Sequence, residues 1–485
     1  MNLSEMVFQS CERFPDRAAL IEGDRTLTYA ELATTVRRWS GHLIEQGGFR
    51  GETIGILMPN GIDFVGAYFG ALAAGKSALP LNPLLALEEL EFILTDAGVA
   101  TLVVSQALMP KAQELSVRLP RLHRILLGTL PEEGPEGAGF PRDTDLATLL
   151  YTSGTTGRPK GVMLTHANLV SNVQACLQIL DIEPDDRFLA ILPFFHAFGL
   201  TGSLVIPLAA GASVELMPTL QPARILAAIA TGNINCLLAV PTVFGVLARL
   251  APEGFRHSLK LAVAGGEPLP ERLFHAWEAR FGLPLREGYG STETAPVISM
   301  TPDSRKSRPG RAGVPLPNLE VRIMGFDGPL PQGEIGEIQV RGPSVMRGYL
   351  NRPKETAEVL DREGWYRTGD LGKLDAEGYL AITGRKRELI ISAGENIYPA
   401  EIEELLRQIP GVAEAAVVGV PDELRGEVPK AVICPEQGQQ LTPTQIRDSL
   451  RGRLADYKMP RVFEFRAEMP RTATGKILKH ALANR

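Results

Sequence analysis

The chain has 485 residues, of which 44% are hydrophobic and 22% charged, the balance of a folded globular protein with room for two or three domains. A formal net charge of −6 argues against a nucleic-acid partner, which would require a basic surface. The four cysteines, Cys11, Cys176, Cys236 and Cys434, show neither a CxxC nor a zinc-ligand spacing, so they predict a cytoplasmic protein without disulfides.

No transmembrane segment is predicted, although one long stretch carries no charge. The N-terminal residues include Glu5 and Glu12 and lack a long apolar run, so no signal peptide is readable. Residues 188–214 are uncharged, but Pro193, Pro207 and several glycines would break a spanning helix. We therefore expect this stretch to form buried strands and loops of a globular domain.

Helices alternate with apolar strands through the first half of the chain. Thr28 and Glu31 have the spacing of a capping box and predict the start of a helix that stops at Gly47–Gly48. Buried strands are predicted at residues 53–59, 102–104, 237–240 and 259–266. Strands separated by helices predict an α/β fold with a parallel, doubly wound sheet, whose functional loops follow the carboxyl ends of the strands.

The pattern of residues changes twice in the second half of the sequence. Short strands punctuated by Gly and Pro predict a β-rich subdomain, a small distorted β-barrel, at about residues 310–384. Beyond it an amphipathic helix at 397–411, two strands within 414–434 and a helix at 442–454 predict a small α+β unit. The chain is therefore divided into a large N-terminal domain, residues 1–384, and a C-terminal domain, residues 385–485.

The stretch YTSGTTGRPKGVMLTH, residues 151–166, crowds hydroxyl side chains, glycines and a lysine into one loop. It is not a Walker A motif, because Pro159 stands five residues after Gly154, where that motif needs glycine. Hydroxyls, glycine N–H groups and the charge of Lys160 nevertheless suit a phosphate. Thr165 is predicted to cap a helix whose amino end adds a favourable dipole. We predict a phosphate-binding loop, with an ordinary Ser/Thr/Gly turn as the alternative.

Four further motifs follow this loop. In chain order the five are TSGTTGRPKGV (152–162), GYGSTE (288–293), YRTGD (366–370), GRKRELIISAGENIYPAEIE (384–403) and PRTATGKILK (470–479). With this ordered set the chain resembles the adenylate-forming superfamily of acyl-CoA synthetases, adenylation domains and beetle luciferases, and is most like fatty acyl-CoA synthetases. The resemblance implies that a carboxylate attacks the α-phosphate of ATP, that pyrophosphate leaves, and that coenzyme A then displaces AMP from the acyl-adenylate.

The resemblance also implies roles for individual residues. Catalytic roles fall to Lys476, Glu293, Thr292 and His196, and magnesium would be held by Glu293 and Thr152. The phosphates would be bound by Thr152, Ser153, Gly154, Thr155, Thr156, Gly157 and Lys160. Adenine would be bound by Gly265, Gly266, Glu267, Gly288, Tyr289 and Gly290, and the ribose by Asp370 with Arg385 nearby.

The C-terminal motifs imply a mobile C-terminal domain. Lys476 would bridge the carboxylate oxygen and the α-phosphate during adenylation. The small domain would then swing about a hinge at Arg387, where the family commonly has Asp or Lys, and withdraw that lysine. Ala393 and Gly394 would then line the channel for the pantetheine arm of coenzyme A.

The identity of the acid is the least constrained feature. The segment LPFFHAFGL, residues 192–200, matches the family's acyl-pocket segment, and it is uncharged apart from His196. Gly265 and Gly266 are expected to leave the pocket floor open, which favours a medium- or long-chain fatty acid, with an aryl acid as the alternative. A carrier protein in place of coenzyme A, luciferase-like oxygenation and an inactive scaffold stay open. So do transient contact with a membrane or carrier protein, and the choice between a monomer and a homodimer.

Overall fold

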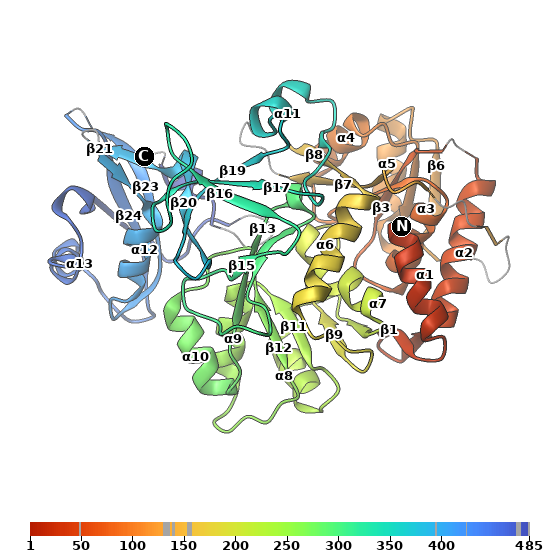
Figure 1. The fold of residues 1–485 in the computed structure, drawn as a ribbon, viewed down its shortest axis with the longest axis horizontal. Coiled ribbons are helices and arrows are strands. Elements are labelled where there is room, and N and C mark those ends of the chain that lie inside the picture. Colours follow the sequence, from red (N-terminus) through yellow and green to blue (C-terminus); the bar gives the residue numbers. More distant parts are fainter. Residues whose placement is uncertain are drawn as a thin grey trace. The chain divides into compact units, whose positions relative to one another are not determined.

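The computed structural model describes residues 1–47, 50–129, 136–137, 141–152, 158–392, 395–422, 424–471 and 477–483. The chain divides into two compact units, which Figure 1 traces from red to blue along the sequence. The first unit is Met1–Val321 with Val340–Tyr366, and the second is Arg322–Gln339 with Arg367–Arg485. The domain boundary at residue 385 stays a prediction.

The first unit contains a nine-stranded sheet in the order β15-β14-β13-β12-β11-β9-β10-β1-β2. The strands are β1 (Ala18–Glu22), β2 (Arg25–Thr28), β9 (Arg187–Ala190), β10 (Ser213–Leu216), β11 (Cys236–Ala239), β12 (Leu261–Ala264), β13 (Arg286–Gly290), β14 (Val297–Met300) and β15 (Val314–Pro315). The strands from β1 to β13 in this order run parallel, whereas β2, β14 and β15 pair antiparallel at the two ends.

The second sheet of this unit has seven strands in the order β18-β8-β7-β4-β3-β5-β6. The strands are β3 (Thr53–Leu57), β4 (Ser77–Pro80), β5 (Thr101–Val104), β6 (Arg124–Leu127), β7 (Leu146–Thr152), β8 (Lys160–Thr165) and β18 (Gly348–Tyr349). Its core, from β7 to β6, is parallel, and β8 and β18 extend it as an antiparallel edge. The α/β fold class with doubly wound sheets is therefore confirmed, as are the four predicted strands.

Helices connect these strands. They are α1 (Leu3–Arg13), α2 (Tyr29–Glu45), α3 (Ile62–Ala73), α4 (Leu87–Asp96), η1 (Gln106–Leu108), α5 (Met109–Arg118), α6 (His166–Ile179), the π-helix η2 (Phe198–Val205), α7 (Ile206–Ala210), α8 (Pro222–Ala230), α9 (Pro241–Leu250), α10 (Glu271–Phe281), η3 (Thr292–Thr294) and α11 (Pro353–Val359). The predicted capping box begins α2, because the Thr28 N–H donates to the Glu31 carboxylate at 2.7 Å and the Glu31 N–H donates to the Thr28 hydroxyl at 3.2 Å.

The uncharged stretch at 188–214 forms β9, η2, α7 and part of β10. The buried strands are as predicted, but the expected loop between them is wrong, because residues 198–210 are helical. Pro207 stands at the start of α7, where a proline is tolerated. Within the described ranges no helix is both long and apolar enough to cross a membrane.

The second unit is richer in strands. Part of the segment after residue 310 forms a four-stranded sheet, β16-β17-β19-β20, from β16 (Glu320–Met324), β17 (Gly336–Arg341), β19 (Tyr366–Leu374) and β20 (Leu380–Arg385). The strands β15 and β18 of the same segment belong to the sheets of the first unit. After η4 (Lys386–Glu388) come β21 (Ile390–Ser392), β22 (Glu395–Ile397), α12 (Pro399–Arg407), β23 (Val412–Asp422), β24 (Gly426–Pro435), α13 (Pro443–Leu450), η5 (Asp456–Lys458), β25 (Val462–Phe465) and α14 (His480–Ala483). The predicted α+β pattern is confirmed by α12, the β23–β24 hairpin and α13.

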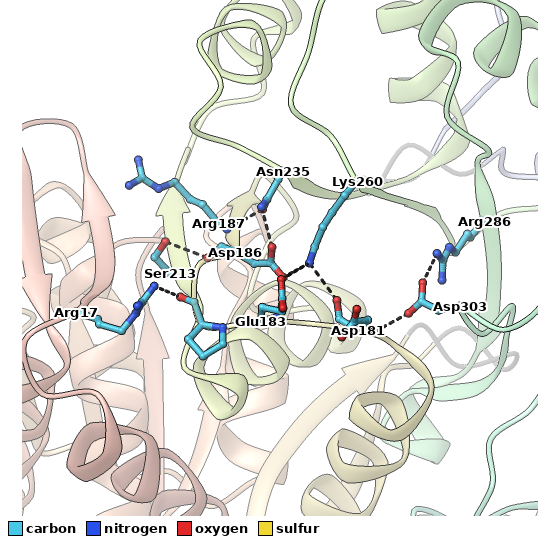
Figure 2. Close-up of polar contacts among 11 residues, drawn as sticks. Arg17, Asp181, Glu183, Asp186, Arg187, Ser213, Asn235, Lys260, Arg286 and Asp303 are labelled. Atoms are coloured by element: carbon cyan, nitrogen blue, oxygen red, sulfur yellow. Dashed lines mark hydrogen bonds and ion pairs between the residues drawn. The ribbon is translucent and has the colours of Figure 1, made fainter.

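A buried carboxylate joins the amino ends of neighbouring strands in the nine-stranded sheet. Asp186, directly before β9, accepts a hydrogen bond from the Asn235 amide at 2.7 Å and pairs with the Lys260 ammonium at 2.7 Å (Figure 2). Asn235 and Lys260 directly precede β11 and β12. The same cluster continues through Asp303 to Arg286, the first residue of β13 (Figure 2).

The seven-stranded sheet has an equivalent cluster. Glu52, directly before β3, pairs with Lys76 at 2.8 Å and with Arg124 at 2.6 Å, and it accepts a hydrogen bond from Thr101 at 3.0 Å. Burial alone would raise the pKa of Glu52, but these hydrogen bonds and charges lower it below its usual value. The carboxylate therefore stays ionised and depends on its cationic partners.

Replacing Lys76 tests whether the ionised Glu52 depends on its cationic partners. Lys76→Met leaves the Glu52 charge buried with Arg124 as its remaining cation, so the free energy of unfolding should fall by about 3 kcal/mol. Arg118→Met is the control, because Arg118 pairs with Glu114, whose side chain is 51% exposed against 2% for Glu52, and should cost less. Urea unfolding followed by tryptophan fluorescence measures both, and equal losses would contradict the assignment.

Candidate nucleotide and acid site

The predicted phosphate loop joins the two strands of a hairpin. β7 and β8 pair antiparallel as far as Thr152 and Lys160, which are register partners. Ser153, Gly154, Thr155, Thr156 and Gly157 lie outside the described residues. Thr165 caps α6 as predicted, since its hydroxyl accepts the N–H of Asn168 at 3.2 Å.

The predicted dipole contribution from α6 is wrong. The residues after Lys160 form the strand β8 and not the helix, so Thr165 lies at the opposite end of that strand. At about 3.3 Å per strand residue, the amino end of α6 is about 16 Å away from Lys160 along the chain. A helix dipole acts only over the first turn, so the loop gains nothing from it.

Tyr349 lies between two of the predicted site residues. β18 pairs with β8, and the Lys160 ammonium lies 5.2 Å from the centre of the Tyr349 ring. The Tyr349 hydroxyl donates to Glu293 Oε1 at 2.8 Å. Burial and the charge of Glu293 raise the pKa of Tyr349, which keeps this hydroxyl a donor. Sequence reasoning did not find Tyr349, because a tyrosine in a short apolar strand is a common core residue and gave no signal of its own.

Two buried amides on α6 hold the segments that carry Glu293 and Tyr349. The Asn172 amide donates to the carbonyls of Thr294 and Val297, and its oxygen accepts the Val297 N–H. The Asn168 amide donates at 2.8 Å to the carbonyls of residues 343 and 345, before Tyr349. The spacing of four residues puts both asparagines on one face of the helix. This spacing is the sequence signal that could have identified them.

A second tyrosine completes the surroundings of Glu293. Tyr366 hydrogen-bonds to Ser291 and to Tyr349, and burial together with the charge of Glu293 raises its pKa. The backbone carbonyl of Glu293 accepts the Met346 N–H at 2.8 Å. Glu293, on η3 next to Thr292, is therefore fixed by hydrogen bonds to both its backbone and its side chain.

The predicted adenine residues lie at the carboxyl ends of two adjacent strands. β12 and β13 are parallel, and the loop from Gly265 to Glu267 follows β12 directly, while Tyr289 lies in β13. Gly290 has no space for a side chain, because a Cβ there would lie 2.1 Å from the Pro296 carbonyl oxygen. Gly288 has more room, with its nearest neighbour at 3.5 Å.

Glu287, directly before the GYGSTE motif, is a buried carboxyl that sequence reasoning missed. Its Oε1 accepts the Leu269 N–H at 3.1 Å, which ties the loop after β12 to β13. Its Oε2 has no hydrogen-bond partner among the described residues, and only 8% of the residue is exposed. Burial raises its pKa from the ordinary 4.5 to about 7, partly offset by the Leu269 N–H. Glu287 is the one buried residue of β13, so the strand carries no apolar pattern that could have signalled it.

An apolar cavity lies beside part of the predicted acyl-pocket segment. A cavity with a free volume of about 20 Å³ is lined only by apolar residues of η2, the neighbouring strands and the segment after α6, including Phe198, Leu238 and Met300. This space has about the size of a single water molecule, so an acyl chain would require the side chains to move. Neither Gly265 nor Gly266 lines this cavity, and their place at the floor of the acyl pocket stays a prediction.

The two glycines have other surroundings. A Cβ on Gly265 would lie 3.1 Å from the Phe198 ring, and Gly266 has a φ of +84°, which favours glycine. His196 is half-buried next to this region but does not line the cavity. Its Nδ1 accepts the Phe198 N–H at 3.3 Å, so the neutral ring carries its proton on Nε2.

The predicted ribose residues lie together in the second unit. Asp370 and Arg385 are register partners in β19 and β20, and Arg385 Nε lies 3.3 Å from Asp370 Oδ1. The backbone N–H of Asp370 donates to the Thr368 hydroxyl at 3.0 Å. Arg387 is exposed in η4. Ala393 and Gly394 lie outside the described residues.

Lys476 also lies outside the described residues, but the chain on both sides of it is anchored. Before it, Arg471 pairs with Glu414 at 2.6 Å. After it, the Lys479 ammonium bridges Glu388 at 2.9 Å and a glutamate of α12 at 2.8 Å. Burial would lower the pKa of Lys479, but these carboxylates raise it.

The acidic residues of the site suit one kind of metal. In the part of the chain that the structure describes, no group of three His, Cys, Asp or Glu side chains could hold an ion by itself. Mg²⁺ does not need such a group, because it takes one or two carboxylates together with phosphate oxygens and water. Glu293, whose Oε1 already accepts the Tyr349 hydroxyl, fits the part of that single carboxylate.

The buried Glu287 carboxyl should make stability depend on pH. Its raised pKa means that the folded state binds a proton more tightly than the unfolded state, so stability is lost as pH rises from about 4.5 through 7. At 1.4 kcal/mol per pKa unit the loss should reach about 3 kcal/mol. Urea unfolding at pH 5 to 8 should show this slope reduced in Glu287→Gln but retained in Glu253→Gln, an exposed control. Identical slopes in all three proteins would disprove it.

Comparison with known proteins adds independent information. The sequence profile of the AMP-binding enzymes matches residues 7–350, and that of the AMP-binding enzyme C-terminal domain matches residues 401–476. Feruloyl-CoA synthase of an Amycolatopsis species is 39% identical, over 97% of this chain and 96% of the relative. Long-chain-fatty-acid–CoA ligase of Bacillus subtilis is 35% identical, over 99% of this chain and 94% of the relative.

Solved structures agree with these relatives. ATP-bound MatB from Rhodopseudomonas palustris is similar with a TM-score of 0.93 and 31% identity, over 99% of this chain and 98% of that one. O-succinylbenzoate coenzyme A synthetase (MenE) from Bacillus subtilis, in complex with ATP and magnesium, has a TM-score of 0.88 and 33% identity, over 98% of both chains.

Proposed function

This chain belongs to the AMP-binding enzyme family, and on that premise we propose that it joins a carboxylic acid to coenzyme A in two steps. In the first step the carboxylate oxygen attacks the α-phosphorus of ATP, and pyrophosphate leaves. In the second step the thiol of coenzyme A attacks the acyl carbon, AMP leaves, and the thiol proton is released. The main support is the meeting of Lys160, Tyr349 and Glu293 at the end of the hairpin that carries the TSGTTG sequence.

Phosphate binding would fall to the hairpin. Lys160 and the hydroxyl of Thr152 would face the β- and γ-phosphates, with the glycines and hydroxyls of the loop between them. Mg²⁺, when bound with ATP, would neutralise phosphate charge, and Glu293 would supply its protein carboxylate together with Thr152. Thr292 would assist from its place beside Glu293. The similarity to MenE, whose structure holds ATP and a magnesium ion, supports the proposal of these two ligands.

Nucleoside binding is proposed for the residues that the resemblance assigns to it. Tyr289 and the loop from Gly265 to Glu267 would contact adenine, since they follow the carboxyl ends of adjacent parallel strands. Asp370, as an ionised carboxylate, would accept both ribose hydroxyls, with Arg385 beside it. Arg387 would act as the hinge, and Ala393 with Gly394 would line the channel for coenzyme A.

Lys476 would neutralise charge in the first step only. Lys476→Ala should lower pyrophosphate exchange by about 10²–10³-fold, because one charge-stabilising donor is lost. Thioester formation from a preformed acyl-adenylate should stay within about twofold of the wild-type rate, because that step does not use the lysine. The exposed Lys354→Ala serves as control and should change neither step. An equal loss in both half-reactions would show that Lys476 has another role.

The acid is proposed to carry an apolar tail. The cavity behind Phe198 has only apolar lining residues, which disfavours acids with a charged or strongly polar tail. A medium- or long-chain fatty acid is the first candidate. An aryl acid is the second, because one similar protein is named a feruloyl-CoA synthase.

A panel of acids tests both the activity and its substrate. Pyrophosphate release would be measured with ATP and Mg²⁺ for acetate, hexanoate, palmitate, benzoate and cinnamate, each with and without coenzyme A. Release that increases with chain length and yields acyl-CoA supports the fatty-acid assignment, and preference for cinnamate or benzoate supports the aryl one. Release without thioester indicates a carrier-protein acceptor or another use of the adenylate, and no release with any acid contradicts the proposed function.

Phe198 should restrict the size of the acid. Phe198→Ala enlarges the cavity, so the kcat/KM ratio of palmitate to acetate should rise about tenfold, the scale of small changes in a hydrophobic pocket. Phe255→Ala is the control, because that ring packs against Phe281 in the same unit and does not line the cavity. Gly266 is a poor position for such a test, since its φ of +84° strains any side chain. An unchanged ratio in Phe198→Ala would place the acid elsewhere.

The cellular context stays a prediction. A cytoplasmic location, transient contact with a membrane or carrier protein, and a monomeric or homodimeric state are the expectations to be tested on the purified protein.

A further inference from the structure

Tyr349 contacts two side chains of opposite charge at once. The Lys160 ammonium lies over its ring, 5.2 Å from the centre, and its hydroxyl donates to Glu293 Oε1 at 2.8 Å. Within the described ranges no ion pair of 4 Å or less joins Lys160 directly to Glu293. The aromatic ring therefore stands between an ammonium and a carboxylate.

Separation of these two charges matters for binding a metal–phosphate complex. A lysine and a glutamate that pair directly neutralise one another, and each must then be released before it can bind a phosphate or a cation. A ring face attracts the ammonium without using a carboxylate, and a phenol hydroxyl occupies one oxygen of the carboxylate without adding charge. Tyr349 can hold both groups in place while leaving their charges uncompensated by each other.

The position of Tyr349 is itself well determined. Its register partner in β8 is Val162, and its N–H donates to the Thr356 hydroxyl at 2.9 Å. Only 8% of the residue is exposed. Gly348 next to it has a φ of +144°, and a Cβ there would lie 2.8 Å from the Thr356 side chain. The backbone around the ring therefore has little freedom to shift.

We propose that Tyr349 is a positioning residue, which holds Lys160 and Glu293 apart so that one binds phosphate and the other a divalent cation. This inference rests on the proposed function, since it assumes that ATP and Mg²⁺ occupy this site. Tyr349 contacts no reacting atom in this account, and it acts through the two side chains on either side of it.

Conservative substitutions separate its two contacts. Tyr349→Phe keeps the ring under Lys160 and removes the hydroxyl, so the affinity for the cation should fall about tenfold, as expected for one lost hydrogen bond to a charged group. Tyr349→Leu also removes the ring face, and should in addition weaken ATP binding at saturating cation concentration. Mn²⁺ binding in the presence of a non-hydrolysable ATP analogue, followed by electron paramagnetic resonance, reads the first effect without turnover.

A matched control lies in the β7–β8 hairpin, which also carries Lys160. The Tyr151 hydroxyl donates to Asp96 Oδ2 at 2.8 Å, so Tyr151→Phe also loses a tyrosine–carboxylate hydrogen bond without touching Glu293. Mn²⁺ affinity should stay unchanged in this variant. An equal loss in Tyr151→Phe, or an unchanged affinity in Tyr349→Phe, would overturn the proposal.

A double mutant and thermal unfolding separate the proposed effect of Tyr349 on Mn²⁺ affinity from a general loss of structure. On a Glu293→Gln background, Tyr349→Phe should cause no further loss of Mn²⁺ affinity, because the hydroxyl acts through that carboxylate; an independent loss would contradict the proposal. Thermal unfolding confirms that each variant is folded before its affinity is compared. Failure of wild-type protein to release pyrophosphate with any acid would count against the proposed function alone, since cation binding is measured without an acid.

Discussion

The candidate site depends on the need of two buried amides for hydrogen bonds. Asn168 and Asn172 lie on one face of α6 in the first unit, and both are buried, Asn172 completely. Their partners are backbone groups of residues 294–297 and 343–345, which are far from α6 in sequence. Because a buried amide left unpaired is costly, these segments stay attached to the helix, and Glu293 and Tyr349 are brought together as a result.

The arrangement joins the edges of two sheets. Glu293 follows β13 of the nine-stranded sheet, and Lys160 and Tyr349 belong to the antiparallel edge of the seven-stranded one. Their contacts occur where each parallel core gives way to antiparallel strands. Charged clusters around Asp186 and Glu52 lie at the amino ends of the parallel strands instead. Cations and amides pair with those two carboxylates. Buried charged residues can therefore have a structural role outside the proposed binding site.

A perturbed carboxyl group therefore has two different meanings in this protein. Glu52 is buried and has a lowered pKa because cations surround it, and it contributes to stability. Glu287 is buried with one oxygen unpaired among the described residues and has a raised pKa, and it lies beside the loop proposed to contact adenine. The number of partners, more than burial, distinguishes a structural carboxylate from one next to a binding region.

Local patterns in the sequence determined much of this protein. The capping box at Thr28, the apolar strands and the hairpin of the C-terminal domain follow from interactions between residues close in the chain, and the five motifs were sufficient to identify the family. The alternation of strands and helices likewise predicted parallel sheets with loops at their carboxyl ends.

The tertiary structure alone decided which distant side chains meet. Tyr349 gains its significance from Lys160 and Glu293, and Phe198, not Gly265 or Gly266, lines the apolar cavity. The predicted dipole of α6 does not reach the phosphate loop, because pairing with β7 and β18 makes residues 160–165 a strand between them. The buried amide hydrogen bonds and the β8–β18 pairing join residues that lie more than a hundred positions apart, so no local pattern records them. Periodicity and capping act within a few residues and can therefore be read in the sequence.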